Sequence, residues 1–472
     1  MKTESDGNDG FVRVLGRADV LALAFGAMIG FGWVVLTGDF ISGAGSLGAA
    51  LAFVIGGTIV TLVGLTYAEL VAAMPRAGGE HHYALRGLGS HGAFIASWGI
   101  VLGYLTVVAF EAVALPETVS YLLPELRAGH LWTVAGDDVH ASWVAIGVGA
   151  AVAITAVNYV GIRPASVFQT VAVLFLVAVG AALLLGSAVG GSAGNLRPLF
   201  EGGAPGLIAV LVATPFLFVG FDVIPQSAEE IRLPQRQVGA VLVVSVGCAI
   251  AWYVLVMLTV ASSLPAGELA ASQLASADGM AALWNSSAMG TVLVIGGIAG
   301  IVTSWNAFLI GASRLLYAMA VSGMLPAWFA RLHPRFRTPS NALLFIGGLS
   351  VLAPLFGDRM LTWLVNAGGI NIVVSYVVVA LSFLALRRRE PEMARPFRVP
   401  AGNAVGVLAL VLSLALAALY LPGMPAALSW PYEWSIVGAW WLAGALLMWR
   451  LPRVAPGPDA EVRLTASVAR NG

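Results

Sequence analysis

Apolar segments of about 20 residues recur along this chain, and they limit its possible folds more than any other feature. A helix of that length crosses the roughly 30 Å hydrocarbon core of a bilayer. Of the 472 residues, 59% are hydrophobic and only 10% are charged, whereas about one quarter of a soluble domain is charged. The sequence therefore predicts an all-α membrane protein that crosses the lipid bilayer many times. Its formal net charge of zero gives no general attraction to nucleic acid, and we expect no such partner.

Twelve of these segments are predicted to be transmembrane helices. They cover residues 15–42, 47–74, 91–123, 142–160, 164–190, 205–231, 237–263, 288–322, 339–357, 360–386, 403–422 and 433–451. Residues 1–14 lack the basic start and short apolar core of a signal peptide, so we expect a cytoplasmic tail and a retained first span. Residues 452–472 are polar and are predicted to be a disordered cytoplasmic tail.

The distribution of basic residues predicts the orientation in the membrane. Arginine residues are concentrated in alternate loops, for example at Arg76 and Arg86 after the second segment. The loops on the opposite side hold only Arg127, Arg197 and Arg359. Because basic loops stay on the cytoplasmic side, we expect both termini in the cytoplasm and the protein in the plasma (inner) membrane.

The first apolar segment contains an unusual run of glycines, "GAMIGFGWVVLTG" at residues 26–38. Glycine in the interior of a helix costs about 1 kcal/mol relative to alanine. Gly26 and Gly30 form a GxxxG step, which in membranes usually marks the close packing of two helices. The alternative interpretation is that the helix is interrupted at mid-depth to form a binding site.

A second interrupted segment favours the binding site. The stretch "TPFLFVGFDVIPQSAEE", residues 214–230, places Pro215, Gly220 and Pro225 in the sixth predicted helix, with Asp222 between them. Helices interrupted by glycine or proline at matching positions of two halves indicate the binding site of a transporter. Unwound N–H groups suit a carboxylate, and unwound carbonyl groups suit an ammonium group.

The match between helices one and six implies two five-helix units of inverted orientation. We predict the first inverted repeat at residues 15–190 and the second at residues 205–386, followed by two further helices within residues 403–451. A substrate would bind midway through the membrane, between helices one, three, six, eight and ten.

Four blocks of the sequence resemble the amino acid–polyamine–organocation (APC) superfamily. They are "GAMIGFGWVVLTG", "AELVAAMPRAGGEHHYALRGLG", "FVGFDVIPQSAEEIRLPQR" and "SRLLYAMAVSGMLPAWFARLHPRFRTPSNALL". The resemblance covers nearly the whole chain and implies the LeuT-like fold that sodium-coupled neurotransmitter transporters share. It also implies alternating-access transport of amino acids or amines.

The resemblance also implies a set of substrate-binding residues. In relatives, the backbone at the Gly30–Gly32 position contacts the substrate carboxylate, and the backbone near Phe218 to Phe221 contacts its amino group. We therefore expect the site to include Ala27, Ile29, Gly30, Phe31, Gly32, Trp33, Phe218, Gly220, Phe221 and Asp222. Relatives often carry Gly-Ser-Gly at the first break, whereas Phe31 and Trp33 narrow the space here unless Phe31 packs outward.

Glu111 lies deep in the third predicted helix, where an ionisable side chain indicates function by default. Its position is similar to one that contacts the substrate tail in arginine/agmatine exchangers, and Trp305 resembles the tryptophan that closes over their substrate. A carboxylate with an aromatic lid suits a cation. Three hypotheses remain for Glu111: it pairs with a substrate ammonium or guanidinium group, it carries a proton, or it donates a hydrogen bond to a neighbouring helix as a neutral acid.

The coupling ion is also left open by the sequence. Some proton-coupled relatives use a lysine in helix five, but Lys2 is the only lysine here, which excludes that mechanism. A sodium site would use carbonyl groups of the first break and the hydroxyl groups of Thr303 and Ser304 in helix eight. Proton coupling through Glu111 or Asp222, or uncoupled exchange, is an equal alternative. For Asp222 we favour a structural role, in which it accepts N–H bonds from the unwound backbone.

Several charged residues are expected near the cytoplasmic end of the helices. Glu229 and Glu230 are predicted to form a gate or loop anchor, and Glu69 and Arg314 are predicted to belong to an inner gate network. His81 and His82 are adjacent, so they do not share one helix face for a metal, and we interpret the pair as part of a loop surface.

The sequence thus predicts a secondary active transporter for a small amine-bearing solute, either an amino acid or an organic amine. Alternatives are a proton-coupled neutral amino acid permease in which Glu111 carries the proton, and a non-transporting membrane receptor or scaffold. No nucleophile and base occur at a recognisable spacing, so we expect neither an enzyme nor a cofactor or metal site.

Overall fold

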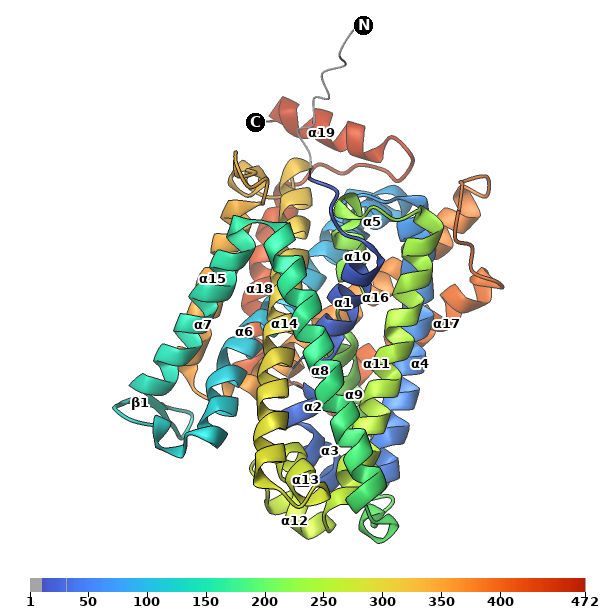
Figure 1. Ribbon diagram of the computed structural model, residues 1–472. Helices are drawn as coiled ribbons and strands as arrows, with labels where there is room; N and C mark the ends of the chain where they lie inside the picture. The colour runs from blue at the N-terminus through green and yellow to red at the C-terminus, as the bar shows by residue number, and fades with distance from the viewer. Residues whose placement is uncertain (1–10, 31, 472) are drawn as a thin grey trace, which may run out of the picture.

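Long helices run side by side through most of the protein (Figure 1). The computed structural model describes residues 11–30 and 32–471. Within these residues, nine helices are long and apolar enough to span a membrane. They are α4 (Ser46–Ala73), α6 (Ser90–Leu122), α7 (Ala141–Val160), α8 (Ile162–Gly190), the Gly203–Gln226 segment that contains α9 and α10, α11 (Gln235–Ser263), α14 (Ser287–Val321), α16 (Met360–Arg389) and α17 (Gly402–Leu419). The prediction of a helical protein with many apolar spans is confirmed.

The other three predicted spans correspond to helices that are interrupted, shorter or less apolar. Residues 15–42 form α1 (Arg17–Met28), α2 (Gly32–Val35) and the start of α3 (Thr37–Ala44). The predicted ninth span is α15 (Ser340–Leu352) followed by the 3-10 helix η5 (Ala353–Phe356), and the predicted twelfth is α18 (Tyr432–Arg450). The count of twelve and the inverted-repeat relation remain predictions.

Helix α6 lies at the centre of the bundle, because it packs against α14, α16, α7 and α15. Of its most apolar 18-residue window, 94% is buried inside the protein, which no other candidate span among the described residues reaches. By contrast, only 28% of the corresponding window of α17 is buried. The helix that carries Glu111 is therefore surrounded by protein, whereas α17 presents most of its apolar surface outward.

A small β-hairpin departs from the all-α expectation. Strands β1 (His130–Val134) and β2 (Asp137–His140) pair antiparallel in the connection between α6 and α7. Ala135 and Gly136 form the two-residue turn with φ values of 50° and 92°, as a tight hairpin with right-handed twist requires. The Trp132 indole donates to the Leu355 carbonyl at 2.9 Å, so the hairpin is fixed to the end of α15 and η5.

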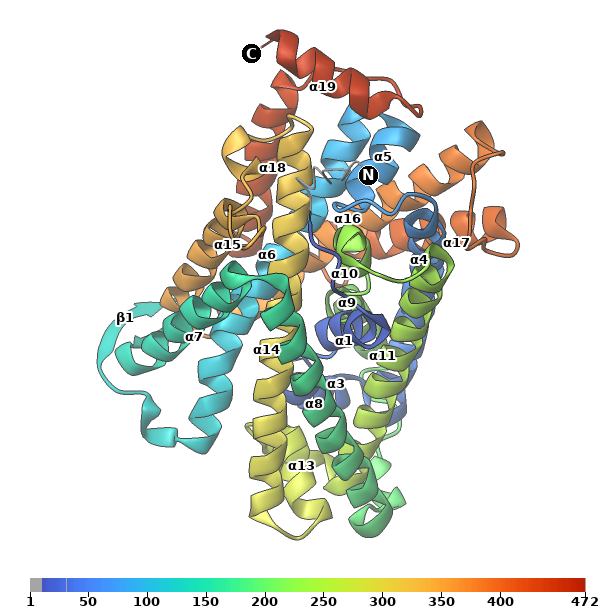
Figure 2. The same cartoon turned by 45° about the horizontal axis from the view of Figure 1, so that its top comes forward.

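The C-terminal tail forms a helix, so the prediction of disorder there is wrong for most of its length. Helix α19 (Ala460–Asn471) lies across the end of the bundle next to α5 (Glu80–Leu88), as Figures 1 and 2 show. Ala460 and Leu464 are buried, and Val468 packs against Gly323 at the end of α14. These three residues have the spacing i, i+4 and i+8, which places them on one face of a helix.

The histidine pair is not part of a loop surface, because both residues lie in α5. His81 is fully buried, and its Nε2 lies 2.7 Å from the Ser322 hydroxyl. Burial lowers the pKa of His81 to about 3, so its ring is neutral at physiological pH. His82 faces α19, where its Nδ1 lies 3.6 Å from a Glu461 carboxylate oxygen that also pairs with Arg76.

Replacing Glu461 is expected to loosen α19 from the bundle. Its contact with His82, together with the charges of His82 and Arg76, lowers the pKa of Glu461 to about 2. The ionised carboxylate therefore contributes to docking at pH values above 4.5, and this contribution is lost as the pH falls toward 2. Glu461→Gln should increase hydrogen exchange of the amides of residues 460–471 at neutral pH.

The matched control is Asp459→Asn, since Asp459 is exposed and makes no ion pair within the described part of the chain. Equal exchange in Glu461→Gln and the unchanged protein would mean that α19 is held by its apolar face alone.

Candidate functional site

The first apolar segment is interrupted where its glycines predict a break. Helix α1 ends at Met28, and Ile29 has non-helical backbone angles of φ −105° and ψ 42°. Ile29 and Gly30 are both outside any helix, and helix α2 begins at Gly32. Phe31 lies outside the described residues, so its predicted place in the site stays a prediction.

The sixth predicted helix is interrupted at the matching place. Helix α9 (Gly203–Phe218) ends before Val219, which is extended, and α10 (Val223–Gln226) begins four residues later. Gly220 has φ +132°, a conformation that side-chain-bearing residues rarely adopt. The Asp222 carboxylate accepts a hydrogen bond from the Gly220 N–H at 2.8 Å. This is the kind of backbone contact that the sequence favours for Asp222, whose roles in substrate binding and coupling stay predictions.

The two breaks lie against each other. A Cβ atom on Gly220 would lie 2.6 Å from the Ala27 Cβ and 3.0 Å from the Met28 nitrogen, so only glycine permits this approach. The Tyr253 hydroxyl of α11 donates to the Met28 carbonyl at 2.8 Å and also lies 3.4 Å from the Leu217 carbonyl. One side chain thus reaches freed carbonyl groups of both interrupted helices.

A small cavity lies beside the two breaks. Its volume is about 20 Å³, which admits a water molecule but not an amino acid. The lining residues come from α1, α2, α6, α9, α11 and α14 and the first break; they are Ala27, Met28, Gly30, Gly32, Val107, Phe110, Glu111, Phe216, Leu217, Tyr253, Ser304 and Phe308. The structure thus brings together five of the residues predicted from the sequence: Ala27, Gly30, Gly32, Glu111 and Ser304.

The Glu111 carboxylate lies directly against the first break. A Cβ atom on Gly30 would lie 2.6 Å from the Glu111 Oε1 and 2.5 Å from the Ser304 Cβ. Glu111 is 2% exposed and has aromatic side chains of Phe110, Phe216 and Phe308 around the same cavity. The absence of a side chain at Gly30 therefore allows a buried carboxylate to meet unwound backbone.

Other predicted site residues do not line this cavity. They are Ile29, Trp33, Phe218, Gly220, Phe221, Asp222, Trp305 and Thr303. Phe221 packs instead against Tyr67 and Tyr376, with ring centroids 5.4 and 5.8 Å apart, and Trp33 packs against Trp252 at 5.3 Å. Trp305 is fully buried, while Ser304 and Phe308 of the same helix face the cavity.

The sequence analysis did not identify the helix-six contacts or Tyr253. Because α9 stays helical through Phe218, the cavity is lined by Phe216 and Leu217, slightly earlier than predicted. Tyr253 carried a usable signal, since its hydroxyl group is a polar group within an apolar segment. Phe110, Phe308, Met28 and Val107 carried none, because apolar residues in a membrane helix do not reveal which face they occupy.

Hydroxyl and amide groups pack behind the first break. The Thr303 hydroxyl lies within 2.8 Å of the Gly300 carbonyl and 3.2 Å of the Gly26 carbonyl, so it is a backbone donor in this structure. Asn306 donates to the Gln169 side chain at 2.9 Å, and the Gln169 amide lies 3.3 Å from the Ala22 carbonyl. A neutral amide network therefore links helices α8 and α14 to α1.

The predicted gate residues belong to two separate ion clusters. Arg314 forms a two-point pair with Glu230, with both nitrogen–oxygen distances 3.0 Å and both side chains at most 2% exposed. Glu69 instead pairs with Arg387 and Arg395. Glu229 is half-buried and has no ion pair among the described residues.

Comparison with known proteins identifies the family. Residues 15–442 match the family described as amino acid permease. This chain belongs to the amino acid permease family. It is 28% identical to the branched-chain amino acid permease BcaP of Bacillus subtilis (strain 168), covering 87% of this chain and 89% of that protein.

Two further relatives differ in what their names say they transport. The methylthioribose transporter of the same organism is 28% identical, covering 82% of this chain and 84% of that protein. The cationic amino acid transporter 4 of Mus musculus is 29% identical, covering 79% of this chain and 60% of that protein. The family and its spans make this permease a multi-pass membrane protein of a transporter family.

Gly30→Ala is expected to destabilise the folded permease, because Gly30 lines the cavity at Glu111. The added methyl group would meet Ser304 and Glu111 at distances that force side chains or backbone to move. Such overpacking typically costs about 1–3 kcal/mol, which thermal unfolding of the purified permease would detect. Gly43→Ala is the matched control, because a Cβ atom there meets no atom within 4 Å. Equal loss of stability in both variants would contradict a special role for the space at Gly30.

Glu230→Gln is expected to cost about 3–5 kcal/mol, since it leaves the Arg314 guanidinium buried without its counter-ion. Glu229→Gln tests the neighbouring glutamate, which is half-buried and outside the pair, and should change stability by less than about 0.5 kcal/mol. The double variant Glu230→Met with Arg314→Met should recover part of the loss, because it removes both charges. A Glu230→Gln variant as stable as the unchanged permease would show that the ion pair between Glu230 and Arg314 does not stabilise the fold.

Proposed function

We propose that this permease is a secondary active transporter that moves a small amine-bearing solute across the plasma membrane by alternating access. The single observation that carries the proposal is the buried Glu111 carboxylate, which lines one cavity together with residues of both interrupted helices. Unwound backbone at membrane depth is tolerated where it is buried in protein or lines a cavity, and an ionisable group there indicates a functional site by default.

A cationic solute fits this chemistry best. An ammonium or guanidinium group would pair with Glu111 and would be attracted by the faces of aromatic rings such as Phe110, Phe216 and Phe308. A carboxylate, where the solute has one, would meet backbone N–H groups of the first break around Gly30 and Gly32. The name of the mouse relative, a cationic amino acid transporter, is consistent with this class of substrate.

The second candidate is a proton-coupled neutral amino acid permease in which Glu111 carries the proton. Some proton-coupled relatives have a lysine in helix five, whereas here Gln169 and Asn306 form a neutral amide network beside the first break. Glu111 is then the ionisable group at the cavity that would carry the proton. The Thr303 hydroxyl, proposed as a sodium ligand, is engaged with backbone carbonyl groups. A sodium ion would have to replace these hydrogen bonds.

The proposed mechanism requires the cavity to expand and to open alternately at each end. A volume of about 20 Å³ is too small for an amino acid, so substrate binding would require the side chains or helices around the cavity to move. We further propose twelve transmembrane helices, arranged as inverted repeats at residues 15–190 and 205–386 and two helices within residues 403–451. Both termini would face the cytoplasm, so the end that carries α5 and α19 would be the inner end (Figure 1).

Substitution of Glu111 distinguishes the candidates. In liposomes loaded with unlabelled solute, Glu111→Gln should lose uptake of labelled cationic amino acids by tenfold or more, about 1.4 kcal/mol, while neutral amino acids are unaffected. If Glu111 is instead the proton carrier, the variant should still exchange neutral amino acids but no longer respond to a pH gradient. Tight binding without movement of any candidate solute would favour a receptor and would contradict the proposal.

Glu117→Gln is the control for this experiment. Glu117 lies in the same helix, is partly exposed and pairs with Arg127 at 2.7 Å near the end of α6. The variant removes the same charge from α6 without changing the cavity, and it should transport like the unchanged permease.

A further inference from the structure

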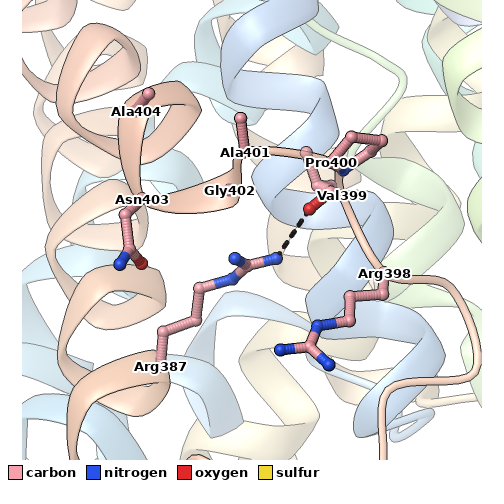
Figure 3. A pocket seen from close by; sticks show the side chains of 8 residues that line it. All are labelled: Arg387, Arg398, Val399, Pro400, Ala401, Gly402, Asn403 and Ala404. Carbon is pink, nitrogen blue, oxygen red and sulfur yellow. Dashed lines mark hydrogen bonds between the residues drawn. The ribbon is translucent and has the colours of Figure 1, made fainter.

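A larger cavity lies at the end of the protein that carries α5 and α19, in the connection between α16 and α17. Its volume is about 480 Å³, and it opens to the surface. It is lined by Arg387 from α16 and by residues 398–404, which lead into α17 (Figure 3). This cavity is separate from the one at Glu111, and nothing in the proposed transport mechanism explains it.

The cavity has an excess of positive charge. Arg387 donates to the Glu69 carboxylate at 2.9 Å, and Arg395 lies 3.0 Å from the same carboxylate. One buried glutamate is therefore shared by two arginines. Arg398 is exposed and makes no hydrogen bond or ion pair with any described residue. Burial lowers the pKa of Arg395; the Glu69 carboxylate opposes this shift, and the charges of Arg387 and Arg398 add to it.

The lining of this cavity combines arginine and amide side chains with the first residues of a helix. Figure 3 shows the guanidinium groups of Arg387 and Arg398 and the amide of Asn403 around the same space. Helix α17 begins at Gly402, beside this cavity. The carbonyl group of Ala401, the residue before the helix, accepts hydrogen bonds from the N–H groups of Ala404 and Val405. The N–H groups of Gly402 and Asn403 lie at the positive end of the helix dipole. Neither of them donates to a backbone carbonyl group of any described residue.

The apolar surface of α17 next to the cavity indicates that an anionic ligand would come from the lipid bilayer. Only 28% of the apolar window of α17 is buried, and its exposed residues include Val407, Val411 and Leu414. Their spacing of i, i+4 and i+7 forms an apolar row along the helix, starting one turn below the cavity. A phospholipid could place its headgroup in the cavity and an acyl chain along this row.

We propose that this cavity binds a phosphate group, and that its source is the headgroup of an anionic phospholipid. Arg398 supplies the unpaired guanidinium, and Arg387 adds a second positive charge while it holds Glu69 of α4. Arginine suits phosphate oxygens because its planar donors bind two of them at once. Occupancy would stabilise the arrangement of α4, α16 and α17 around the ion cluster.

The test measures thermal unfolding of the purified full-length permease in detergent, titrated with phosphatidylglycerol or with phosphatidylcholine of the same acyl chains. A ligand that binds the folded state raises its apparent stability in proportion to occupancy. Phosphatidylglycerol should stabilise more than phosphatidylcholine. Arg398→Gln should weaken the apparent affinity for phosphatidylglycerol by about fivefold or more, the effect of one arginine charge at a lipid surface.

The matched control is Arg388→Gln. Arg388 is exposed at the end of α16, has no partner among the described residues and does not line the cavity. It removes the same charge, so its effect should be less than twofold. Equal loss in both variants, or equal stabilisation by both lipids, would overturn the proposal in favour of diffuse surface electrostatics.

Two further measurements keep the result interpretable. Arg398→Lys should retain part of the affinity, and the lipid-free unfolding temperature of each variant reports whether it folds normally. Inorganic phosphate provides the second arm of the titration. If millimolar phosphate stabilises the permease as well as phosphatidylglycerol does and competes with it, the site is a phosphate site but the lipid source is wrong.

Discussion

The structure depends on the requirement that backbone polar groups inside a membrane protein find partners within the protein. Two helices are interrupted inside the bundle, so some of their backbone N–H and carbonyl groups need partners outside the helix. Gly220 lets the second break reach the first, the Asp222 carboxylate accepts its freed N–H, and the Tyr253 hydroxyl lies between the Met28 and Leu217 carbonyls. These bonds satisfy part of the unwound backbone, and the remaining groups border the cavity. The position of the cavity therefore follows from the way in which the breaks are supported.

The same constraint explains why Glu111 stands where it does. A carboxylate surrounded by protein on the most buried helix has little water to stabilise its charge, so it needs a proton, a cation or strong donors. Gly30 brings unwound backbone against it, and aromatic rings of Phe110, Phe216 and Phe308 exclude solvent. In such a site the arrival of a positive group changes the local electrostatic balance far more than it would at the surface. The proposed coupling between ligand binding and helix movement therefore needs no other charged residue at the cavity.

The sequence predicted the positions of the breaks but not the faces that surround them. Glycine and proline act on the local backbone, so Gly30 and Gly220 could be located without knowledge of the fold. Which aromatic ring faces the cavity depends instead on where α9 ends. Because α9 is helical through Phe218, Phe216 lines the cavity and Phe221 does not. The tail was mispredicted for another reason: its composition is polar, but the i, i+4 spacing of Ala460 and Leu464 is helical and amphipathic.

The two ends of the permease differ in how their charges are paired. At the α5 and α19 end, the Glu230–Arg314 pair is buried and Glu69 holds two arginines. At the β-hairpin end, the pairs of Arg127 and Arg359 with their acidic partners are between 21% and 58% exposed. Separating a buried pair exposes uncompensated charge and costs several kcal/mol, whereas an exposed pair contributes about 0–1 kcal/mol. In the proposed alternating access, separating the ion pairs at the hairpin end would therefore cost less than separating Glu230 from Arg314 at the other end.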